Sequence, residues 1–174
     1  LIGLLCDYQE HLGIDEITFH KNSAMFDDKP KITDLLNRGA RLCVDEHKVN
    51  EFKKIGMDPD LETKESIKRA SVIIDCTPKG VGRINKKKYY ERFTKDVRGF
   101  LAQGSEDGFG KKYARGINDK ILENSDQFIQ IVSCNTHNIA AITKTIAMAD
   151  DPDNLIEGKY VCIRRANDLS QSDN

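Results

Sequence analysis

The segment SVIIDCTPKG, residues 71–80, decides the fold class. Its apolar side chains follow one another with little polar interruption, and a proline and a glycine come soon after them. An unbroken apolar run is typical of a parallel strand that is covered on both faces, because neither side of such a strand meets water. We therefore expect a buried parallel strand here, followed by a turn at the sheet edge where α/β proteins bind ligands.

Further strand-like runs alternate with helix-like segments along the rest of the chain. The other expected strands are 16–20, 40–45, 99–104, 128–134 and 159–165. The expected helices are 1–12, closed near Gly13; 32–39, ended by Gly39; 46–56; 63–70, with Thr63 as its N-cap; 85–93; and a last one from about Asn138 to Met148. Strands that alternate with helices predict an α/β fold built on a doubly wound parallel sheet.

The composition is that of a globular chain with balanced charge. Hydrophobic residues make up 39% of its 174 residues, and 27 basic against 28 acidic side chains leave a net charge of -1. That balance does not favour nucleic acid as a partner. No apolar run approaches a membrane span and no signal-peptide pattern is visible, so we expect a cytoplasmic protein without a membrane partner. Five cysteines without a C-x-x-C pair indicate reduced thiols and no metal site.

The segment IVSCNTHNIAAIT, residues 131–143, places Cys134 where a strand-like run passes into a helix-like one. A thiol becomes a strong nucleophile when it is ionised, and a helix N-terminus favours the ionised form. Backbone amides at the same turn could stabilise an oxyanion on a carbonyl that the sulfur attacks. Cys134 is therefore a candidate nucleophile, and the alternative is a small buried apolar residue. His137 is a candidate base or a helix cap, and Cys76 is the second candidate thiol.

Two glycine-rich turns follow successive strands. TPKGVG, residues 77–82, and AQGSEDGFG, residues 102–110, each allow close approach to backbone, and together they predict a ligand crevice at the strand ends. Arg164 and Arg165 end the last expected strand as a cationic pair that suits phosphate, with surface ion pairs as the alternative. The lysine-rich segment 85–93 is better explained as a solvated helix face than as a nucleic-acid surface.

Four segments in this order, IIDCTPKGVGRINKKKYY, FLAQGSED, IVSCNTHN and CIRRAND, resemble the archaeal-type (type II) glyceraldehyde-3-phosphate dehydrogenases. The resemblance runs over nearly the whole chain. It implies a homotetrameric oxidoreductase that converts glyceraldehyde 3-phosphate to 1,3-bisphosphoglycerate with NAD(P) and inorganic phosphate. Residues 1–134 would be a Rossmann-like NAD(P)-binding domain that lacks its first strand, and residues 135–174 the beginning of an α+β catalytic domain.

The resemblance also assigns individual residues. Cys134 would be the nucleophile, with Ser133 and Asn135 beside it at the substrate. The cofactor would contact Leu1, Ile2 and Gly3 as the last positions of a G-x-G-x-x-G turn, Lys21 and Asn22 after the second strand of the unit, Gly104, Arg164 and Arg165. Because Lys21 and Asn22 stand where NAD-selective sheets usually carry an acid, the sequence favours NADP, with NAD as the alternative.

The resemblance further predicts a partial chain, since the sequence begins without Met and ends directly after a strand-like run. The family's catalytic histidine would then lie outside it. We expect Leu1 to begin a helix beside an unfilled strand position, and Cys134 to face the same crevice as Gly80 and Gly104. Residues 1–174 alone are expected to be poorly soluble and inactive.

Two other functions stay open. Another cysteine-dependent dehydrogenase, such as an aspartate-semialdehyde dehydrogenase or an acyl-phosphate reductase, would share Cys134 and act on a different aldehyde. A non-catalytic NADP-binding module would use the sheet and leave the thiol unacylated. His137 and Asn138 depart from the small or glycine-containing pair that usually follows SCNT in the family, which bears on the shape of the pocket.

Overall fold

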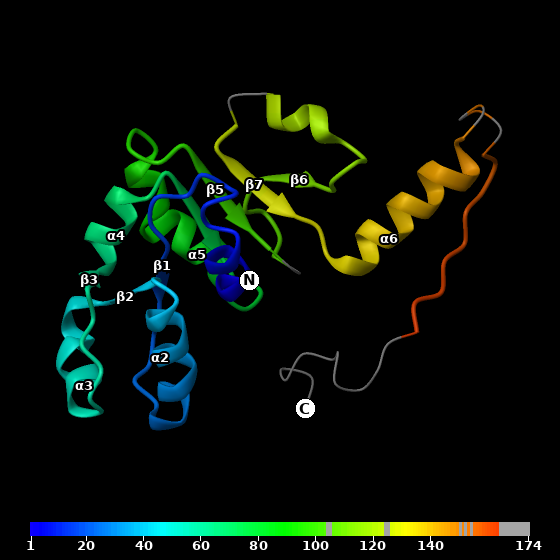
Figure 1. The fold of residues 1–174 in the computed structure, drawn as a ribbon. Coiled ribbons are helices and arrows are strands. Elements are labelled where there is room, and N and C mark those ends of the chain that lie inside the picture. Colours follow the sequence, from blue (N-terminus) through cyan, green and yellow to red (C-terminus); the bar gives the residue numbers. More distant parts are fainter. Residues whose placement is uncertain (104–105, 124–125, 150, 152, 154, 164–174) are drawn as a thin grey trace. The chain divides into compact units, whose positions relative to one another are not determined.

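The computed structural model describes residues 1–174 except 104–105, 124–125, 150, 152, 154 and 164–174 (Figure 1). Two compact units divide the chain: Leu1–Ser71 with Lys95–Val97, and Val72–Thr94 with Arg98–Asn174. Each unit carries its own parallel sheet with helices beside it. The predicted fold class is confirmed, because parallel strands alternating with helices form an α/β, Rossmann-like arrangement.

The first unit has a three-stranded parallel sheet in the order β1-β2-β3. Its strands are β1 (Thr18–His20), β2 (Arg41–Val44) and β3 (Leu61–Glu62). Its α-helices are α1 (Ile2–Asp7), α2 (Lys29–Asn37), α3 (Val49–Lys54) and α4 (Thr63–Arg69), with short 3-10 turns at Phe26–Asp28 and Glu46–Lys48. In the ladder Phe19 lies opposite Leu42, which places the middle strand β2 at the centre of this core.

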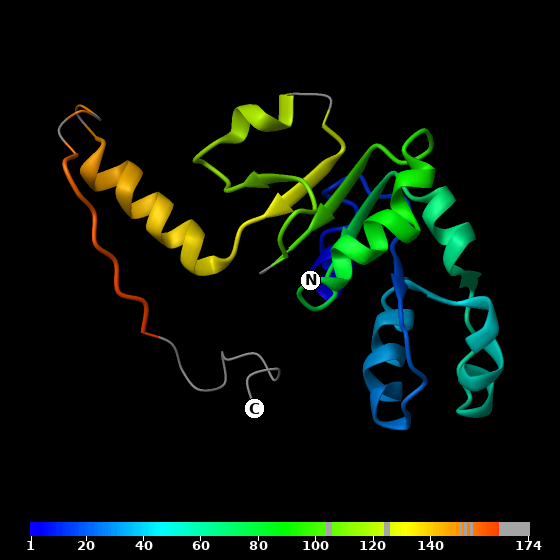
Figure 2. The same cartoon turned by 180° about the vertical axis from the view of Figure 1, so that it is seen from behind.

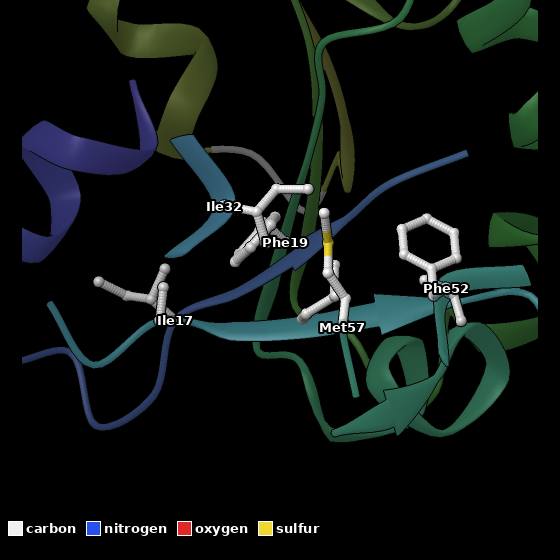
Figure 3. Packing of buried hydrophobic residues seen from close by; sticks show 8 residues of the cluster. Ile17, Phe19, Ile32, Phe52 and Met57 are labelled. Carbon is white, nitrogen blue, oxygen red and sulfur yellow. The ribbon is translucent and has the colours of Figure 1, made fainter. Parts of the chain in front are cut away.

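The core of the first unit forms around β2. Leu42 and Val44 are fully buried there, and Phe52 from α3 is buried as completely. Figure 3 shows Ile32 of α2 beside Phe19 of β1, with Met57 near both. Ile2, Leu5 and Cys6 of α1 are partly buried against the same cluster, whereas Leu4 is exposed, and this one-sided burial fits the helical apolar pattern of the opening segment.

The second unit has a four-stranded parallel sheet in the order β4-β5-β7-β6. Its strands are β4 (Val72–Asp75), β5 (Gly99–Ala102), β6 (Lys111–Tyr113) and β7 (Phe128–Ile131). Its helices are α5 (Val81–Lys88), 3-10 turns at Tyr90–Phe93 and Asp119–Glu123, and α6 (Cys134–Ile142), which continues as a π-helix at Thr143–Ala147. Figure 2 shows α5 alongside the sheet and α6 leading directly out of β7.

Aromatic side chains hold the second unit together. Phe100 of β5 stacks on Tyr90 and on Phe128, with ring centroids 5.3 and 4.6 Å apart. Phe109 is fully buried and meets both Tyr90 and Phe128 edge to face. The ammonium of Lys86 lies 4.3 Å from the centroid of the Phe128 ring, so a cation–π contact links α5 to the sheet.

The expected burial of strand 71–80 is wrong. Val72 and Ile74 are exposed by 51% and 37%, and only Asp75 of β4 is buried. β4 is an edge strand, paired with β5 alone among the described strands, and its apolar side chains are not covered on both faces. The apolar run thus correctly predicts a strand, but the prediction that this strand is covered on both faces is wrong.

Several element boundaries also differ from the expectation. Residues 159–163 form no strand and are exposed, and 164–165 lie outside the described residues. The last helix begins at Cys134 and not near Asn138, since Ser133 caps it. Thr63 is not an N-cap: Glu62 holds that position, and the Thr63 hydroxyl donates to the Asp45 carboxylate at 2.7 Å.

Other differences concern turns. α1 ends at Asp7, and the chain turns through Gly13, whose φ is 62°. β6 was not expected, because KKY carries no apolar alternation. Its neighbour Gly110 is required by close packing: a Cβ there would lie 2.0 Å from the carbonyl oxygen of Phe128.

Two predictions about domains and edges stay predictions. α1 does begin directly after Leu1, which is its N-cap. β1 and β4 are edge strands of their own sheets. The predicted unfilled strand position beside α1 and the predicted domain boundary after residue 134 both stay predictions. Among the described helices, none has the length and apolar character that crossing a membrane requires.

Candidate active site

A pocket of about 470 Å³ opens at the carboxyl ends of β4, β5 and β7. Its lining residues are Cys76, Thr77, Pro78, Lys79, Gln103, Ile131, Val132, Ser133 and Cys134. They come from the segments that leave three neighbouring parallel strands, and this is the edge where open α/β sheets bind their ligands. The crevice predicted from the two glycine-rich turns therefore has a counterpart within the second unit.

Cys134 is exposed and is the first residue of α6. Ser133 is the N-cap: its Oγ accepts the Thr136 amide at 3.3 Å and lies 2.9 Å from the Thr136 hydroxyl. The first amides of a helix have no intrahelical acceptor, so those beside the sulfur are available to a ligand oxygen. The question of whether Cys134 is buried as a small apolar residue is settled, because its side chain lines the pocket.

His137 is not positioned as a base for Cys134. Its Nε2 lies 3.0 Å from the carbonyl oxygen of Arg115, and its own amide donates to the carbonyl of Ser133. No hydrogen bond joins His137 to Cys134 in the part of the chain that the structure describes. The imidazole instead helps to tie α6 to the loop after β6, together with Lys144, which donates to the carbonyl of Gly116 at 2.7 Å.

Asp75 organises the turn after β4, and sequence reasoning missed it. Its buried carboxylate accepts the Thr77 amide at 2.9 Å, the Thr77 hydroxyl, the Asn85 amide at 2.9 Å and the Tyr90 hydroxyl at 2.7 Å. Burial raises the pKa of Asp75, but the hydrogen bonds from these donors outweigh it and hold the pKa below its usual value. The aspartate that directly ends an apolar strand was the available signal.

Glu106 is the second carboxylate that shapes this turn. It is 4% exposed, and its Oε2 accepts the amides of Gly80 at 2.8 Å and Gly82 at 3.1 Å. Gly80 has a φ of 86°, and a Cβ on Gly82 would lie 3.0 Å from Oε2 of Glu106. The glycines of TPKGVG thus admit a carboxylate of the chain itself, which takes the N-terminus of α5 that an outside anion could otherwise use.

Gln130 links Glu106 to the sheet. Its Nε2 donates to the backbone carbonyl of Glu106, while its Oε1 is buried and has no hydrogen-bond partner among the described residues. Gln130 belongs to β7, which leads into Cys134. One residue therefore connects the strand that leads into the candidate nucleophile with the loop that holds the turn after β4.

The predicted cofactor residues of the first unit have partners within that unit. Leu1, Ile2 and Gly3 begin α1, and a Cβ on Gly3 would lie 2.6 Å from Nη1 of Arg38. Nη1 is the end of a flexible side chain that can move away, so this contact does not by itself require glycine; the Arg38 guanidinium pairs with Asp7 at 3.2 Å.

Lys21 and Asn22 follow β1 and are engaged in polar contacts. The Lys21 ammonium pairs with Asp28 at 2.6 Å, and this hydrogen bond holds the pKa of Asp28 below its usual value. The side-chain oxygen of Asn22 accepts the Lys48 ammonium at 2.6 Å. The charge of Lys48 also acts on the Asp45 carboxylate and helps to lower its pKa, so each ammonium group at this strand end has a carboxylate of the chain near it.

The remaining predicted residues divide between the pocket and the undescribed segments. Ser133 lines the pocket with Cys134, whereas Asn135 is half-buried and does not. Gly104, Arg164 and Arg165 lie outside the described residues.

Of the other cysteines, Cys76 lines the pocket, Cys43 is buried in β2, Cys6 packs on the first core, and Cys162 is exposed outside any strand. Within the described residues, no group of three or more His, Cys, Asp or Glu side chains could hold a metal ion.

Parallel strands flanked by helices, with a pocket at their carboxyl ends and a cysteine at a helix start, define a Rossmann-like α/β protein. The predicted resemblance is confirmed, since the chain is similar to archaeal proteins named glyceraldehyde-3-phosphate dehydrogenase. That of Pyrobaculum islandicum is 30% identical over 118 residues, 65% of this chain and 32% of the relative. That of Pyrobaculum arsenaticum is 33% identical over 106 residues, 58% and 29%.

The relative from Sulfolobus acidocaldarius is 30% identical over 137 residues, 76% of this chain and 37% of the relative. The chain thus spans about a third of the length of the curated relatives it matches. No family model matches the chain.

Proposed function

We infer that this chain supplies the cysteine-bearing, nucleotide-binding part of a phosphorylating glyceraldehyde-3-phosphate dehydrogenase. The substrate would be glyceraldehyde 3-phosphate, the product 1,3-bisphosphoglycerate, and the co-reactants NAD(P) and inorganic phosphate. The observation that carries the proposal is Cys134, exposed at the first residue of α6 in the strand-end pocket. The names of the archaeal relatives support the same reaction.

The sulfur of Cys134 would form a bond to the aldehyde carbon, and the carbonyl electrons would move onto its oxygen. The first amides of α6 would donate to that oxygen while it carries negative charge. NAD(P), when bound, accepts a hydride from the same carbon. Cys134 would then hold the substrate as a thioester. A phosphate oxygen would attack the thioester carbon, the carbon–sulfur bond would break, and Cys134 would leave as its thiolate.

The cofactor is proposed to be NADP, with NAD as the alternative. The segment after β1 supports this choice, because Lys21 and Asn22 stand where NAD-selective sheets usually carry an acid. These residues would hold the 2′-phosphate. Leu1, Ile2 and Gly3 are proposed to approach the pyrophosphate, and Gly104, Arg164 and Arg165 keep the roles that the resemblance assigns them. A homotetramer of the full-length protein belongs to the same proposal.

The test is Cys134→Ser in the full-length protein. We expect it to abolish dehydrogenase activity and leave NADP binding largely intact, because the hydroxyl is a far weaker nucleophile than the thiolate. Cys162→Ser, which changes an exposed thiol outside the pocket, is the matched control and should retain activity. Normal turnover in Cys134→Ser would overturn the proposal.

Two measurements separate the other functions. A panel of aldehydes with and without phosphate tells the proposed enzyme from another cysteine-dependent dehydrogenase. NADP binding without acylation of Cys134 by any of these aldehydes would indicate a non-catalytic module.

A further inference from the structure

The strand-end pocket carries one charged side chain among its lining residues, and this is Lys79. Lys79 is exposed in the turn between β4 and α5. Within the described residues it forms no ion pair or hydrogen bond, unlike Lys86 of α5, which donates to the carbonyl of Phe109 at 2.6 Å. Its ammonium is therefore available to a ligand in the pocket.

The carboxylates nearest to this turn in the sequence do not neutralise Lys79 by direct pairing. Asp75 is buried and takes its hydrogen bonds from Thr77, Asn85 and Tyr90. Glu106 is also buried and binds the amides of Gly80 and Gly82. Both carboxylates are satisfied by donors of the second unit, and no acidic side chain is among the described residues that line the pocket.

A second source of positive potential opens onto the same pocket. Cys134 begins α6, whose nine residues form a helix long enough to have an appreciable dipole. Its first amides and the Lys79 ammonium belong to segments that line one cavity. Both favour a negatively charged group on the ligand, and the lysine can reach it because its stem is flexible.

We propose that Lys79 is a specificity-determining residue, whose ammonium selects pocket ligands that carry an anionic group, phosphate or carboxylate, within reach of the turn after β4 while Cys134 attacks their carbon. The proposal rests on the proposed function for the role of Cys134. An exposed ion pair of this kind changes an affinity or rate by about threefold. Lys79 thus acts on the choice of ligand, while Cys134 performs the bond making.

Two alkylating reagents of nearly equal size, one charged and one neutral, test this directly. Iodoacetate is an anion and iodoacetamide is neutral, and both label Cys134. The quantity measured is the ratio of their labelling rates at Cys134 in the full chain, read by peptide mapping with a protease that does not cleave at lysine. We expect Lys79→Gln to lower the ratio by about threefold and Lys79→Arg to preserve it. Lys120→Gln, an exposed lysine away from the pocket, removes the same charge and should leave the ratio unchanged.

Competition with unreactive anions separates the sources of the anionic group. Inorganic phosphate and NADP are each added while iodoacetamide labels the wild-type chain and Lys79→Gln. If phosphate protects Cys134 less well in Lys79→Gln than in the wild-type chain, Lys79 recognises a free or substrate phosphate. If only the protection by NADP is weaker in Lys79→Gln, Lys79 recognises the cofactor.

An unchanged iodoacetate-to-iodoacetamide ratio in Lys79→Gln would overturn the proposal, as would an equal fall in both rates, which would place the effect on the thiol itself. Neither result touches the proposed function, which fails only if Cys134→Ser retains turnover.

Discussion

The turn after β4 and the junction after β7 border the same pocket and are built in opposite ways. Buried carboxylates hold the first: Asp75 binds its beginning at Thr77, and Glu106 binds its end at Gly80 and Gly82. The second has the Ser133 cap and leaves Cys134 exposed. The difference teaches that the turn after β4 is a frame whose backbone is fixed by buried carboxylates, whereas the junction after β7 is held by its own cap and presents the exposed Cys134 to the pocket.

The largest effect should come from Asp75→Ala. It leaves the Tyr90 hydroxyl and the Asn85 and Thr77 donors without their acceptor, and unpaired buried polar groups cost about 1–3 kcal/mol each. We expect the free energy of unfolding of the second unit to fall by about 3 kcal/mol. Hydrogen exchange of peptides from 72–94 in urea measures this change. Asp107→Ala, an exposed acid near Glu106, is the control. Equal stability of the two variants would break the comparison.

A smaller loss is expected from Glu106→Gln. The amide keeps one acceptor oxygen and loses the charge, so we expect a destabilisation of about 1–2 kcal/mol. Faster hydrogen exchange should be confined to residues 80–88, where the carboxylate binds the start of α5. The exposed Glu91→Gln is the matched control. Unchanged exchange at 80–88 would mean that Glu106 does not hold this turn.

On the other side of the pocket, Ser133→Ala should cost about 1 kcal/mol, the usual value of a lost N-cap. The Thr136 amide loses its acceptor, so exchange should increase at the start of α6 and stay unchanged in α5. Ser133→Thr retains a hydroxyl and should restore most of the protection. An effect that spreads to α5 would show that frame and junction are one cooperative element.

The last and smallest expected effect concerns the charge of Asp75 and appears only in acid. Its pKa is lowered in the folded state, so its stabilising contribution is fully present above the unfolded value of 3.8 and is lost as the pH falls through the lower, folded pKa. The free energy of unfolding of the wild-type chain, measured with urea, should therefore decrease as the pH falls through this range. Asp75→Asn, which has no proton to gain, should show a flatter acid limb than Asp107→Asn.

The sequence predicts the elements better than the contacts between them. The helix end at Gly39 and the cysteine at a strand-to-helix junction depend on neighbouring residues, and both appear in the structure. The Glu106 clamp on Gly80 joins residues 26 apart in the chain, which no local pattern encodes. The apolar run of β4 could not reveal its own exposure, because covering depends on strands and helices elsewhere.

The candidate site divides in the same way. Cys134 follows from its place at a helix start, and the structure puts it in a pocket, whereas the pairing with His137 fails because the imidazole meets Arg115. Lys79 was hidden within a turn noted for its glycines. Lys79 is available to a ligand because Asp75 and Glu106 bind other donors, and only the folded structure shows those contacts.

The buried phenol of Tyr90 has a consequence for following this protein by ultraviolet spectroscopy. The chain has no tryptophan and five tyrosines, so its near-ultraviolet absorption and emission come from phenols. Burial raises the pKa of Tyr90, and the Asp75 carboxylate raises it further. Stability from this group is present below the ordinary tyrosine value near 10 and is lost as the pH rises above it. Tyr90 should therefore form its phenolate only as the aromatic core around Phe100 opens, which makes its absorbance an intrinsic optical reporter of that event.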